Sequence, residues 1–232
     1  MRAMRLAMFL GLTLMATAAP AVARSPVVVE LYTAQGCASC REANINLGKL
    51  AEQPGVLALT FSVDYWDYLG WPDTFAKPEF SDRQKAYEAR FGLREPYTPQ
   101  VVINGRAQAG GQQADKIDKL IQTAARNLHA PAMAFVGNRR VDVGSGPVPR
   151  GGAEVWLVRY DKAKLDVQVK TGDNRGQTVS HVQVVRELRR LGSWSGRPTA
   201  YRMPSTPTDG LATAVLVQGV RGGRILGALS PQ

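Results

Sequence analysis

The two cysteines of the chain lie in one C-x-x-C motif, Cys37-Ala38-Ser39-Cys40. The motif falls between a predicted strand and a predicted helix, where unpaired helix N–H groups and the positive end of the helix dipole favour a thiolate. Cysteines in such motifs have pKa values lowered to about 3.5–7.5 and carry out thiol–disulfide exchange. Cys37 precedes the helix, so we expect it to be the exposed nucleophile. Cys40 is placed to attack the resulting mixed disulfide, and Arg41 adds a nearby positive charge.

The cysteine pair has two other uses that must be weighed. A structural disulfide closing a four-residue loop would contribute only about 2 kcal/mol, against about 3 kcal/mol for a 15-residue loop. A soft metal site usually needs further Cys, His or Met ligands. Beyond the N-terminal segment the chain offers four, none near the motif in sequence: His129, His181, Met133 and Met203. We therefore favour redox chemistry and expect no bound metal.

A second signal is the dipeptide Thr98-Pro99, just before the predicted strand Gln100–Asn104. A proline cannot donate to the hydrogen bonds of a sheet, so its position at the start of a buried strand needs a reason. A cis Thr98–Pro99 bond would turn the chain sharply and leave the Thr98 backbone open for pairing with an extended substrate. A trans proline is the commoner arrangement, but beside a strand, a C-x-x-C motif and a helix we favour the cis form. Thr98 and Pro99 are thus expected to shape a substrate groove.

Two tyrosines, two tryptophans and two aspartates fall within eight residues in the segment Asp64-Tyr65-Trp66-Asp67-Tyr68-Leu69-Gly70-Trp71, which follows the second predicted strand. The rings could form an apolar platform for a substrate polypeptide, and an acid could assist proton transfer. For most of these residues we prefer a structural role, in packing the segment against the domain. Asp64 and Trp66 are the auxiliary candidates. Glu30 is a third, because an acid in an apolar strand is unusual, although it could instead point to solvent at a sheet edge.

The first half of the chain alternates segments typical of strands and helices. Runs of apolar and β-branched residues predict strands, and apolar residues at helical spacing predict helices. Ser81 is an expected N-cap, and Gly92 follows the end of that helix. The expected elements are strand Val27–Thr33, helix Cys40–Ala51, strand Val56–Val63, helix Phe80–Phe91, strands Gln100–Asn104 and Ala107–Ala109, and helix Asp115–Leu128.

After Pro131 the segments become short and alternating, and Gly and Pro separate them. Short strands at a spacing of about 10 residues suggest an antiparallel sandwich. We place the boundary between the two halves near Ala130. The strands expected in the second half are Val155–Tyr160, Leu165–Lys170, His181–Glu187 and Leu211–Gln218.

Residues from about Val27 to Leu128 resemble the thioredoxin superfamily. The run Glu30-Leu31-Tyr32-Thr33-Ala34-Gln35-Gly36-Cys37 looks like the first strand and active-site entry of a glutaredoxin-like member. The resemblance implies Cys37 as nucleophile, Cys40 as resolving thiol and Pro99 as the cis proline facing them. The expected fold is an α/β thioredoxin-like domain over residues 24–130, followed by an all-β antiparallel sandwich-like domain over residues 131–232.

A closer resemblance is to a bacterial secreted family catalogued as domain of unknown function 1223. This chain departs from the family pattern at Ser62, where members commonly have His, and at Arg41, where they often have Pro. The first departure argues against a histidine base or ligand at that position. The family's activity is poorly defined, so the resemblance implies a fold more than a function. The matching segments are Val29-Glu30-Leu31-Tyr32-Thr33, Gln35-Gly36-Cys37, residues 63–71, Arg83-Gln84, Tyr97-Thr98-Pro99-Gln100, Gly172-Asp173-Asn174 and Val184-Val185-Arg186.

The first 23 residues have the layout of a secretory signal peptide. Arg2 and Arg5 precede an uncharged apolar run, and Ala21-Val22-Ala23 is an A-x-A cleavage pattern. An uncleaved anchor helix is the alternative, but Pro20 and the neighbouring alanines make a poor membrane helix. We expect cleavage after Ala23. The protein would then be periplasmic or secreted, without a stable membrane span, in a compartment where disulfides persist.

Composition excludes several classes of protein. The 232 residues are 44% hydrophobic and 21% charged, which is typical of a globular protein and not of a disordered or multi-spanning one. The formal net charge is +10. The basic residues are scattered and no aromatic–basic stacking motif stands out, so we expect no nucleic-acid partner.

The sequence therefore predicts a thiol–disulfide oxidoreductase that acts on protein or peptide thiols through Cys37 and Cys40. It would need a redox partner of unknown identity and no cofactor, because the dithiol carries the electrons. One alternative is a metallochaperone that uses the two thiols, against which the scarcity of other soft ligands counts. Another is a non-enzymatic binding module on a thioredoxin scaffold, against which the intact C-x-x-C motif counts.

Overall fold

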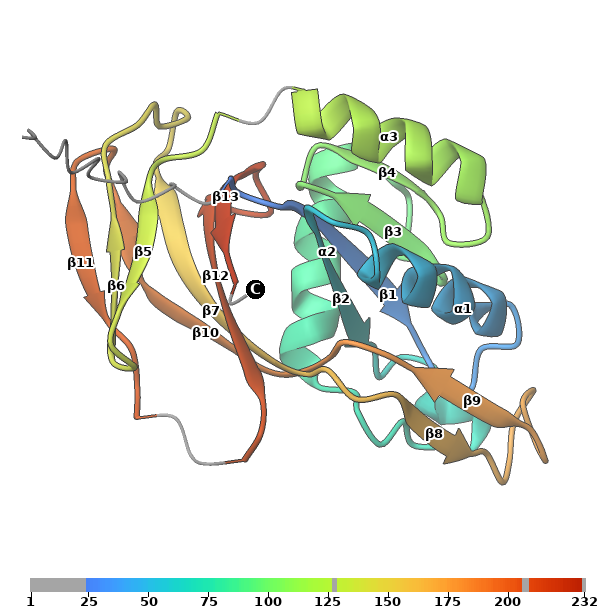
Figure 1. Ribbon diagram of the computed structural model, residues 1–232. Helices are drawn as coiled ribbons and strands as arrows, with labels where there is room; N and C mark the ends of the chain where they lie inside the picture. The colour runs from blue at the N-terminus through green and yellow to red at the C-terminus, as the bar shows by residue number, and fades with distance from the viewer. Residues whose placement is uncertain (1–23, 127–128, 206–208, 231–232) are drawn as a thin grey trace, which may run out of the picture.

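The computed structural model describes residues 24–126, 129–205 and 209–230 (Figure 1). The helices are α1 (Cys40–Ala51), the 3-10 turn η1 (Asp67–Leu69), α2 (Pro78–Phe91) and α3 (Ala114–Arg126). The strands before residue 130 are β1 (Val27–Thr33), β2 (Val56–Ser62), β3 (Gln100–Ile103) and β4 (Ala107–Gly110). The later strands are β5 (Met133–Val136), β6 (Arg140–Val143), β7 (Ala153–Asp161), β8 (Leu165–Gln168), β9 (Thr178–His181), β10 (Val184–Trp194), β11 (Thr199–Arg202), β12 (Ala212–Gly219) and β13 (Ile225–Leu229).

One eight-stranded mixed sheet contains strands from both halves of the chain, in the order β13-β12-β7-β10-β2-β1-β3-β4. β1 lies parallel to β2 and antiparallel to β3, which forms a hairpin with β4. On the other side of β2, β10 pairs in parallel at Val184 and Thr60. β7, β12 and β13 follow β10 in antiparallel order. The long strands of the second half therefore extend the sheet of the first half (Figure 1).

This continuity corrects the expected fold. An α/β thioredoxin-like domain followed by an all-β sandwich-like domain is wrong, because the described chain is mostly β and its largest sheet crosses the expected boundary. Thr60 makes the junction: its N–H donates to the carbonyl of Gln183 at 2.9 Å and its hydroxyl to the carbonyl of Val182 at 2.6 Å. Alternating hydrophobicity predicts that a segment is a strand but does not say which strand edge it pairs with.

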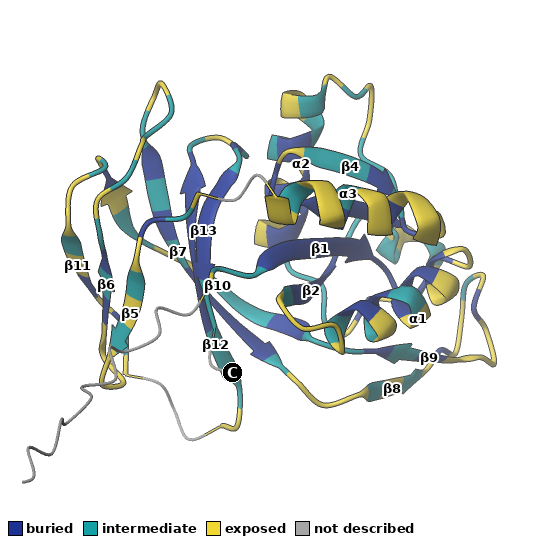
Figure 2. Cartoon of the chain, turned by 45° about the horizontal axis from the view of Figure 1, so that its top comes forward, coloured by how far each residue is buried: buried dark blue, intermediate teal, exposed yellow. Residues whose placement is uncertain are grey.

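Helices cover both faces of the part of the sheet that contains β1 (Figure 2). Successive strand residues point to opposite faces, and all seven residues of β1 are buried. On one face, Leu31 packs with Leu47 of α1 and Ile117 of α3. On the other face, Tyr32 belongs to a core that includes Phe80 of α2 and also residues of β7, β10 and β12. α2 thus packs in a core built from both halves of the chain.

Two smaller sheets complete the structure. The three-stranded sheet β11-β6-β5 shares a core with β7, β10 and β12, in which Val141, Leu157, Trp194 and Val217 are buried. The two-stranded sheet β8-β9 lies beside α1, on the same side of the molecule as the β1–α1 connection (Figure 1). The second of these sheets brings residues from far along the chain to the helix that carries the cysteine motif.

The first-half elements match their predicted bounds closely. β1 and α1 have the predicted limits, and α3 begins one residue before the predicted start. The last predicted residue of that helix, Leu128, lies outside the described residues. α2 begins at Pro78, with Lys77 as the N-cap, so the expected N-cap at Ser81 is wrong. Ser81 instead lies inside the helix, and its hydroxyl donates to Oδ1 of Asp64 at 2.6 Å.

The second-half elements were predicted less well. The expected strand His181–Glu187 is divided between β9 and β10, because the chain turns at Gln183, which has a φ of 53°. Such a left-handed conformation interrupts regular strand pairing. β5, β6, β11 and β13 were not predicted at all. The boundary placed near Ala130 falls in the connection between α3 and β5.

The predicted signal peptide lies outside the described residues. Within the three described ranges, no helix is both long enough and apolar enough to cross a membrane. Cleavage after Ala23 and export therefore stay predictions.

Candidate functional site

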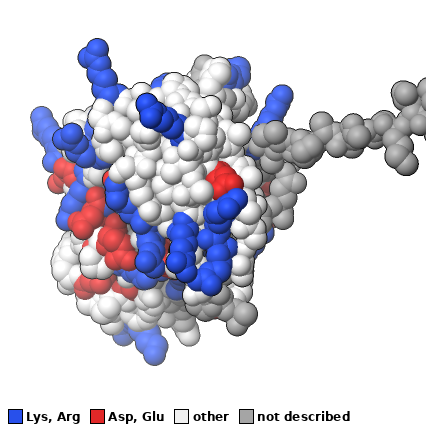
Figure 3. All heavy atoms as spheres, turned by 90° about the vertical axis from the view of Figure 1, so that its left-hand side faces the viewer, with Lys and Arg blue, Asp and Glu red and all other residues white. Residues whose placement is uncertain are grey.

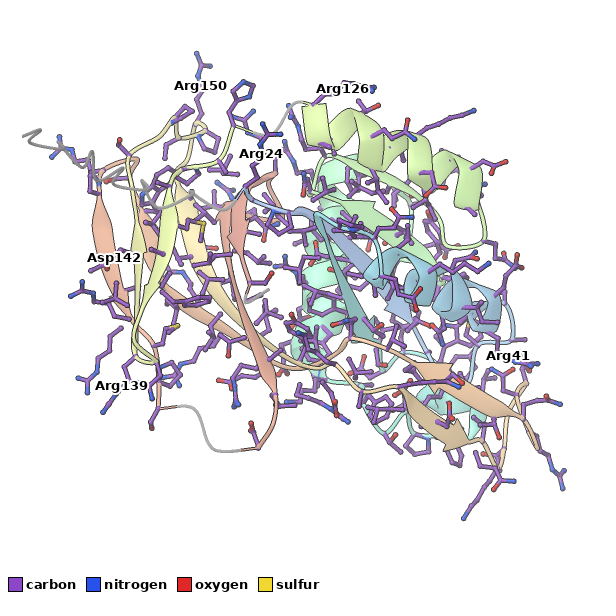
Figure 4. The ribbon with its side chains drawn as sticks, viewed as in Figure 1. Arg24, Arg41, Arg126, Arg139, Asp142 and Arg150 are labelled. Atoms are coloured by element: carbon purple, nitrogen blue, oxygen red, sulfur yellow. A yellow bond between two sulfur atoms is a disulfide. The ribbon has the colours of Figure 1, made fainter. Side chains whose placement is uncertain are left out.

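The two cysteines form a disulfide where β1 leads into α1. The Cα atoms of Cys37 and Cys40 are 5.4 Å apart. Cys40 is the first residue of α1, and its N–H donates to the carbonyl of Cys37 at 3.1 Å. Arg41 follows as an exposed residue at the outer end of the helix (Figure 4). The disulfide therefore lies at a helix N-terminus, where unpaired N–H groups and the helix dipole favour negative charge on sulfur.

Both cysteines are buried, so the expected exposure of Cys37 is wrong. Cys37 is 1% exposed and Cys40 is fully buried, whereas Ala38 and Ser39 between them are exposed. The motif indicates that Cys37 precedes the helix, but it carries no information on distant segments that pack against the motif. Two such segments meet here: residues 64–76, which we call the aromatic segment, and residues 169–177, which we call the Asn174 turn.

Thr98 lies directly beside Cys37. Its hydroxyl donates to Sγ of Cys37 at 3.4 Å and accepts a hydrogen bond from Nε1 of Trp66 at 2.7 Å. The Thr98–Pro99 peptide bond is cis, the form that the sequence favoured. Among the described residues, neither the N–H nor the C=O of Thr98 has a hydrogen-bond partner. Both groups can therefore pair with another chain.

The two candidates from the aromatic segment have different surroundings. Trp66 packs against the core that contains the cysteines and reaches Cys37 through Thr98. The carboxylate of Asp64 accepts a hydrogen bond from the hydroxyl of Ser81, and the N–H of Asp64 donates to the same hydroxyl at 3.3 Å. Asp64 thus attaches the aromatic segment to α2. The described contacts of Asp64 do not include either cysteine.

Gln35 holds the aromatic segment against the entrance to the motif, a role that the sequence did not reveal. Its side-chain carbonyl accepts hydrogen bonds from Nε1 of Trp71 at 2.9 Å and from the N–H of Thr74 at 3.3 Å. Its backbone N–H donates to Oδ2 of Asp73 at 2.7 Å. Burial raises the pKa of Asp73 to about 6, although the hydrogen bonds from Gln35 and Phe75 act to lower it.

Asn174 brings the second half of the chain to the motif. Its buried side-chain amide donates to the carbonyl of Gln35 at 2.8 Å and to the carbonyl of Cys37 at 3.0 Å. The Asn174 turn also touches the aromatic segment, because the hydroxyl of Thr171 donates to the carbonyl of Gly70 at 2.5 Å. In the sequence, the triplet Gly172-Asp173-Asn174 is notable only as part of a family resemblance. No local pattern could predict a contact across 137 positions of sequence.

Glu30 is buried in a network at the middle of the sheet, so the alternative in which it points to solvent is wrong. Its carboxylate accepts from Nε of Arg83 at 2.7 Å and from the hydroxyl of Tyr87 at 2.5 Å. Gln218 of β12 accepts from Arg83 at 2.9 Å and donates to Tyr87 at 2.8 Å. Burial acts to lower the pKa of Arg83, but the adjacent Glu30 carboxylate raises it above its usual range. The described contacts of Glu30 join β1, α2 and β12 and do not include a cysteine.

His181 lies behind the helix that carries Cys40, although it is remote from the motif in sequence. Its Nδ1 is 3.4 Å from Nδ2 of Asn44, one turn after Cys40, and Asn44 accepts from the hydroxyl of Thr33 at 3.0 Å. The ring packs edge-on against Phe75. Burial lowers the pKa of His181 to about 4, so the ring is neutral at neutral pH. Its Nε2 has no hydrogen-bond partner within the described part of the chain.

The remaining soft ligands do not gather at the cysteines. Met133 and Met203 belong to the core under the three-stranded sheet, and His129 lines a separate cavity. The described residues contain no group of three or more His, Cys, Asp and Glu side chains arranged to hold a metal ion. Within the described part of the chain, His181 is the one of the four soft side chains that approaches the helix carrying Cys40, through its contact with Asn44.

Charges of both signs are interleaved on the face formed by the three-stranded sheet and its neighbours (Figure 3). Arg140 pairs with Asp142 at 3.0 Å, and Arg190 pairs with Glu154 at 2.6 Å. Arg139 and Asp142 lie on this side of the molecule (Figure 4). Paired charges of this kind produce a solvated surface and not a continuous basic stripe.

Sequence comparison shows that the chain belongs to the family described as protein of unknown function (DUF1223), which it matches over residues 28–218. The family that the sequence resembled is therefore confirmed. A crystal structure of a protein from Agrobacterium tumefaciens, a target of the Northeast Structural Genomics Consortium, is similar in fold, with a TM-score of 0.74 at 31% sequence identity. The comparison covers 90% of this chain and 94% of that one. No curated protein matches the chain.

Proposed function

We propose that this protein exchanges thiols and disulfides through Cys37 and Cys40, on protein or peptide substrates outside the cytoplasm. The observation that carries the proposal is the disulfide at the N-terminus of α1 with the Thr98 hydroxyl 3.4 Å from Sγ of Cys37. A helix N-terminus and a hydroxyl donor both stabilise a thiolate there. The predicted signal peptide supports the location, where such a bond can persist.

The exchange starts from the disulfide form. A substrate thiolate attacks Sγ of Cys37, the Cys37–Cys40 bond breaks, and Cys40 leaves as a thiolate. A second substrate thiolate then attacks the substrate sulfur of the mixed disulfide and releases Cys37. The substrate loses two electrons and becomes a disulfide, while the protein gains them and ends as two thiols with the two substrate protons. The reverse sequence reduces a substrate disulfide, and a redox partner with its own dithiol or disulfide restores the starting form.

The surroundings of Cys37 indicate how a substrate would approach. The unpaired N–H and C=O of Thr98 can pair with an extended peptide beside the sulfur. Trp66, held by Thr98, provides an apolar surface next to this backbone. Because Cys37 is buried, the aromatic segment or the Asn174 turn must move before a substrate sulfur reaches it.

The burial of both sulfurs favours a second candidate, a non-enzymatic binding module whose disulfide only fixes the start of α1. In this case the bond would hold Gln35 and the aromatic segment in place without reacting. The two candidates differ in whether the native protein exchanges its disulfide with a thiol in solution.

Turnover of a peptide disulfide, followed with wild type and two single-cysteine variants, tests the proposal. We expect Cys37→Ser to abolish turnover and Cys40→Ser to accumulate a mixed disulfide between Cys37 and the peptide. If Cys40→Ser stays folded, as judged by circular dichroism, and forms no mixed disulfide, the result would favour the binding module. Full activity in Cys37→Ser would refute the redox assignment altogether.

A further inference from the structure

We infer a second site, at the other end of β1 from the disulfide, which binds a small phosphate-bearing anion. A cavity of about 510 Å³ opens there, lined by four arginines, Arg90, Arg106, Arg150 and Arg224. A neighbouring cavity of about 190 Å³ shares Arg106 and Arg224 with it and adds His129. We call the two together the arginine pocket.

The four arginines come from four separate segments of the chain. Arg90 lies in the last turn of α2, and Arg106 is the last residue of the turn between β3 and β4. Arg150 precedes β7, and Arg224 lies between β12 and β13. Figure 4 shows Arg150 at the margin of the molecule, where its side chain extends outward from the loop. The pocket is therefore assembled by the fold, and no run of basic residues in the sequence indicates it.

Backbone packing holds three of these segments against one another. A Cβ on Gly105 would lie 2.5 Å from the carbonyl oxygen of Gly223, and a Cβ on Gly222 would lie 2.8 Å from the backbone of Ala86 in α2. Asn104 adds two hydrogen bonds, because its side chain accepts from the N–H of Val28 at 2.7 Å and its carbonyl accepts from the N–H of Ile225 at 2.8 Å. The walls that carry Arg90, Arg106 and Arg224 are thus fixed before any ligand arrives.

The charges of the pocket have no counter-charge within the described chain. No Asp or Glu lines either cavity, and none of the four arginine side chains makes an ion pair or hydrogen bond with a described residue. Arg140, Arg159 and Arg190 elsewhere are paired with carboxylates. Like charges gathered around one cavity repel, and an anion that enters relieves the repulsion.

Guanidinium groups and pocket size together indicate the ligand class. A guanidinium is a planar fork of donors that matches the oxygens of phosphate. The cavity is large enough for more than a lone ion, because pockets for small molecules occupy about 300–1,000 Å³. The same cavity has an apolar part of its wall, formed by Phe91, Pro149 and Val220. A ligand with one or more phosphate groups and a less polar remainder fits both features.

The pocket is separate from the disulfide. Its turn at Asn104 is bonded to Val28, at the start of β1, whereas the cysteine motif follows the end of that strand at Thr33. Ligand binding in the arginine pocket can therefore be measured independently of thiol–disulfide exchange. The anion site and the redox function can each be refuted while the other stands.

Isothermal titration calorimetry of the purified protein at low salt tests the inference, with inorganic phosphate and pyrophosphate as soluble probes. Vesicles of phosphatidylcholine with and without phosphatidic acid, used in a sedimentation assay, show whether a lipid headgroup presents the phosphate. The test variant is Arg106→Ala with Arg224→Ala. The control variant, Arg139→Ala with Arg189→Ala, removes the same charge from exposed positions outside the pocket.

We expect saturable binding of pyrophosphate to one site, weakened about tenfold or more in the pocket variant and changed less than about threefold in the control. Binding to phosphatidic acid vesicles alone, with the same variant dependence, would support the site with a lipid as the source of phosphate. Equal weakening in both variants, or no saturable binding to any probe, would overturn the inference. If the alanine variant fails to fold, Arg106→Lys with Arg224→Lys replaces it, because lysine keeps the charge and removes the guanidinium group. An affinity of this lysine variant for pyrophosphate equal to that of wild type would overturn recognition by guanidinium groups.

Discussion

Thr98 places a hydroxyl beside the sulfur at which we propose that exchange takes place. This hydroxyl connects Trp66 to Cys37, and a hydroxyl donor would stabilise the thiolate that the proposed exchange produces. We expect Thr98→Val to slow exchange with glutathione about 3- to 10-fold, because Cys37 Sγ loses one of its two hydroxyl donors, the other being Ser39, and Trp66 loses its acceptor. Thr98→Ser keeps a hydroxyl at this position and should exchange with glutathione at close to the wild-type rate. A Thr98→Val protein that reacts as fast as wild type would remove Thr98 from the mechanism.

His181 makes folding stability sensitive to acid. Its pKa is about 4 in the folded protein, against about 6.5 when unfolded. Between these values the unfolded chain binds more protons, so the free energy of unfolding falls as pH falls from about 6.5 to about 4, by about 3 kcal/mol from this residue. Asp73 acts in the opposite direction. Its pKa of about 6 contributes stability at low pH that is lost as pH rises from about 4 to about 6.

Substitution of His181 isolates its share of this pH dependence. We expect His181→Gln to lose much less stability than wild type between about pH 7 and about pH 4.5, measured by urea unfolding. An unchanged slope in His181→Gln would show that the buried ring does not titrate as described.

The site illustrates what single residues reveal in a sequence. The cysteine motif and Thr98-Pro99 were found because few structural roles require these residue types at this spacing. Gln35, Asp73 and Asn174 were not singled out, because each acts through hydrogen bonds to backbone or side-chain groups distant in sequence. The burial of Cys37 was missed for the same reason.

At the scale of elements, we propose that the Asn174 turn and the aromatic segment control access to the buried Cys37. Asn174→Ala would remove the two hydrogen bonds that join the turn to Gln35 and Cys37, each worth about 0.5–1.5 kcal/mol. We expect the turn to open more often, so that glutathione reduces the disulfide several-fold faster under native conditions. Asn46→Ala is a matched control, because the Asn46 amide also donates to a backbone carbonyl, but to that of Gly111. Equal rates in the Asn174 and Asn46 variants would show that the turn does not limit access.

The elements themselves were predicted better than their partners. β1 is a run of apolar and β-branched residues and α1 has apolar residues at helical spacing, and the bounds of both match the prediction. The pairing of β10 with β2 was missed because the edge of β2 that β10 covers has no sequence signature. β5, β6, β11 and β13 are short or carry few β-branched residues, so local propensity did not identify them.

At the scale of the whole molecule, the continuous sheet argues that the two halves depend on each other. The core around Tyr32 and Phe80 includes Val158, Leu216 and Ile225 from the second half. We expect a fragment of residues 24–130 to lack a cooperative thermal transition, because it would expose this core and one edge of β2. The chain from residue 24 to the end is the control. Cooperative unfolding of the fragment at a temperature close to that of the control would show that the first half is a domain by itself.

The central claim is that the Cys37–Cys40 bond reacts in the folded protein. The most direct measurement is its redox equilibrium in defined glutathione buffers under native conditions, with acid quenching, alkylation and mass spectrometry to count free thiols. We predict reversible reduction with a midpoint within the range of about −270 to −120 mV found for exchange-active C-x-x-C pairs. A bond that stays oxidised in every buffer until the protein unfolds would contradict the claim and leave the disulfide with a structural role.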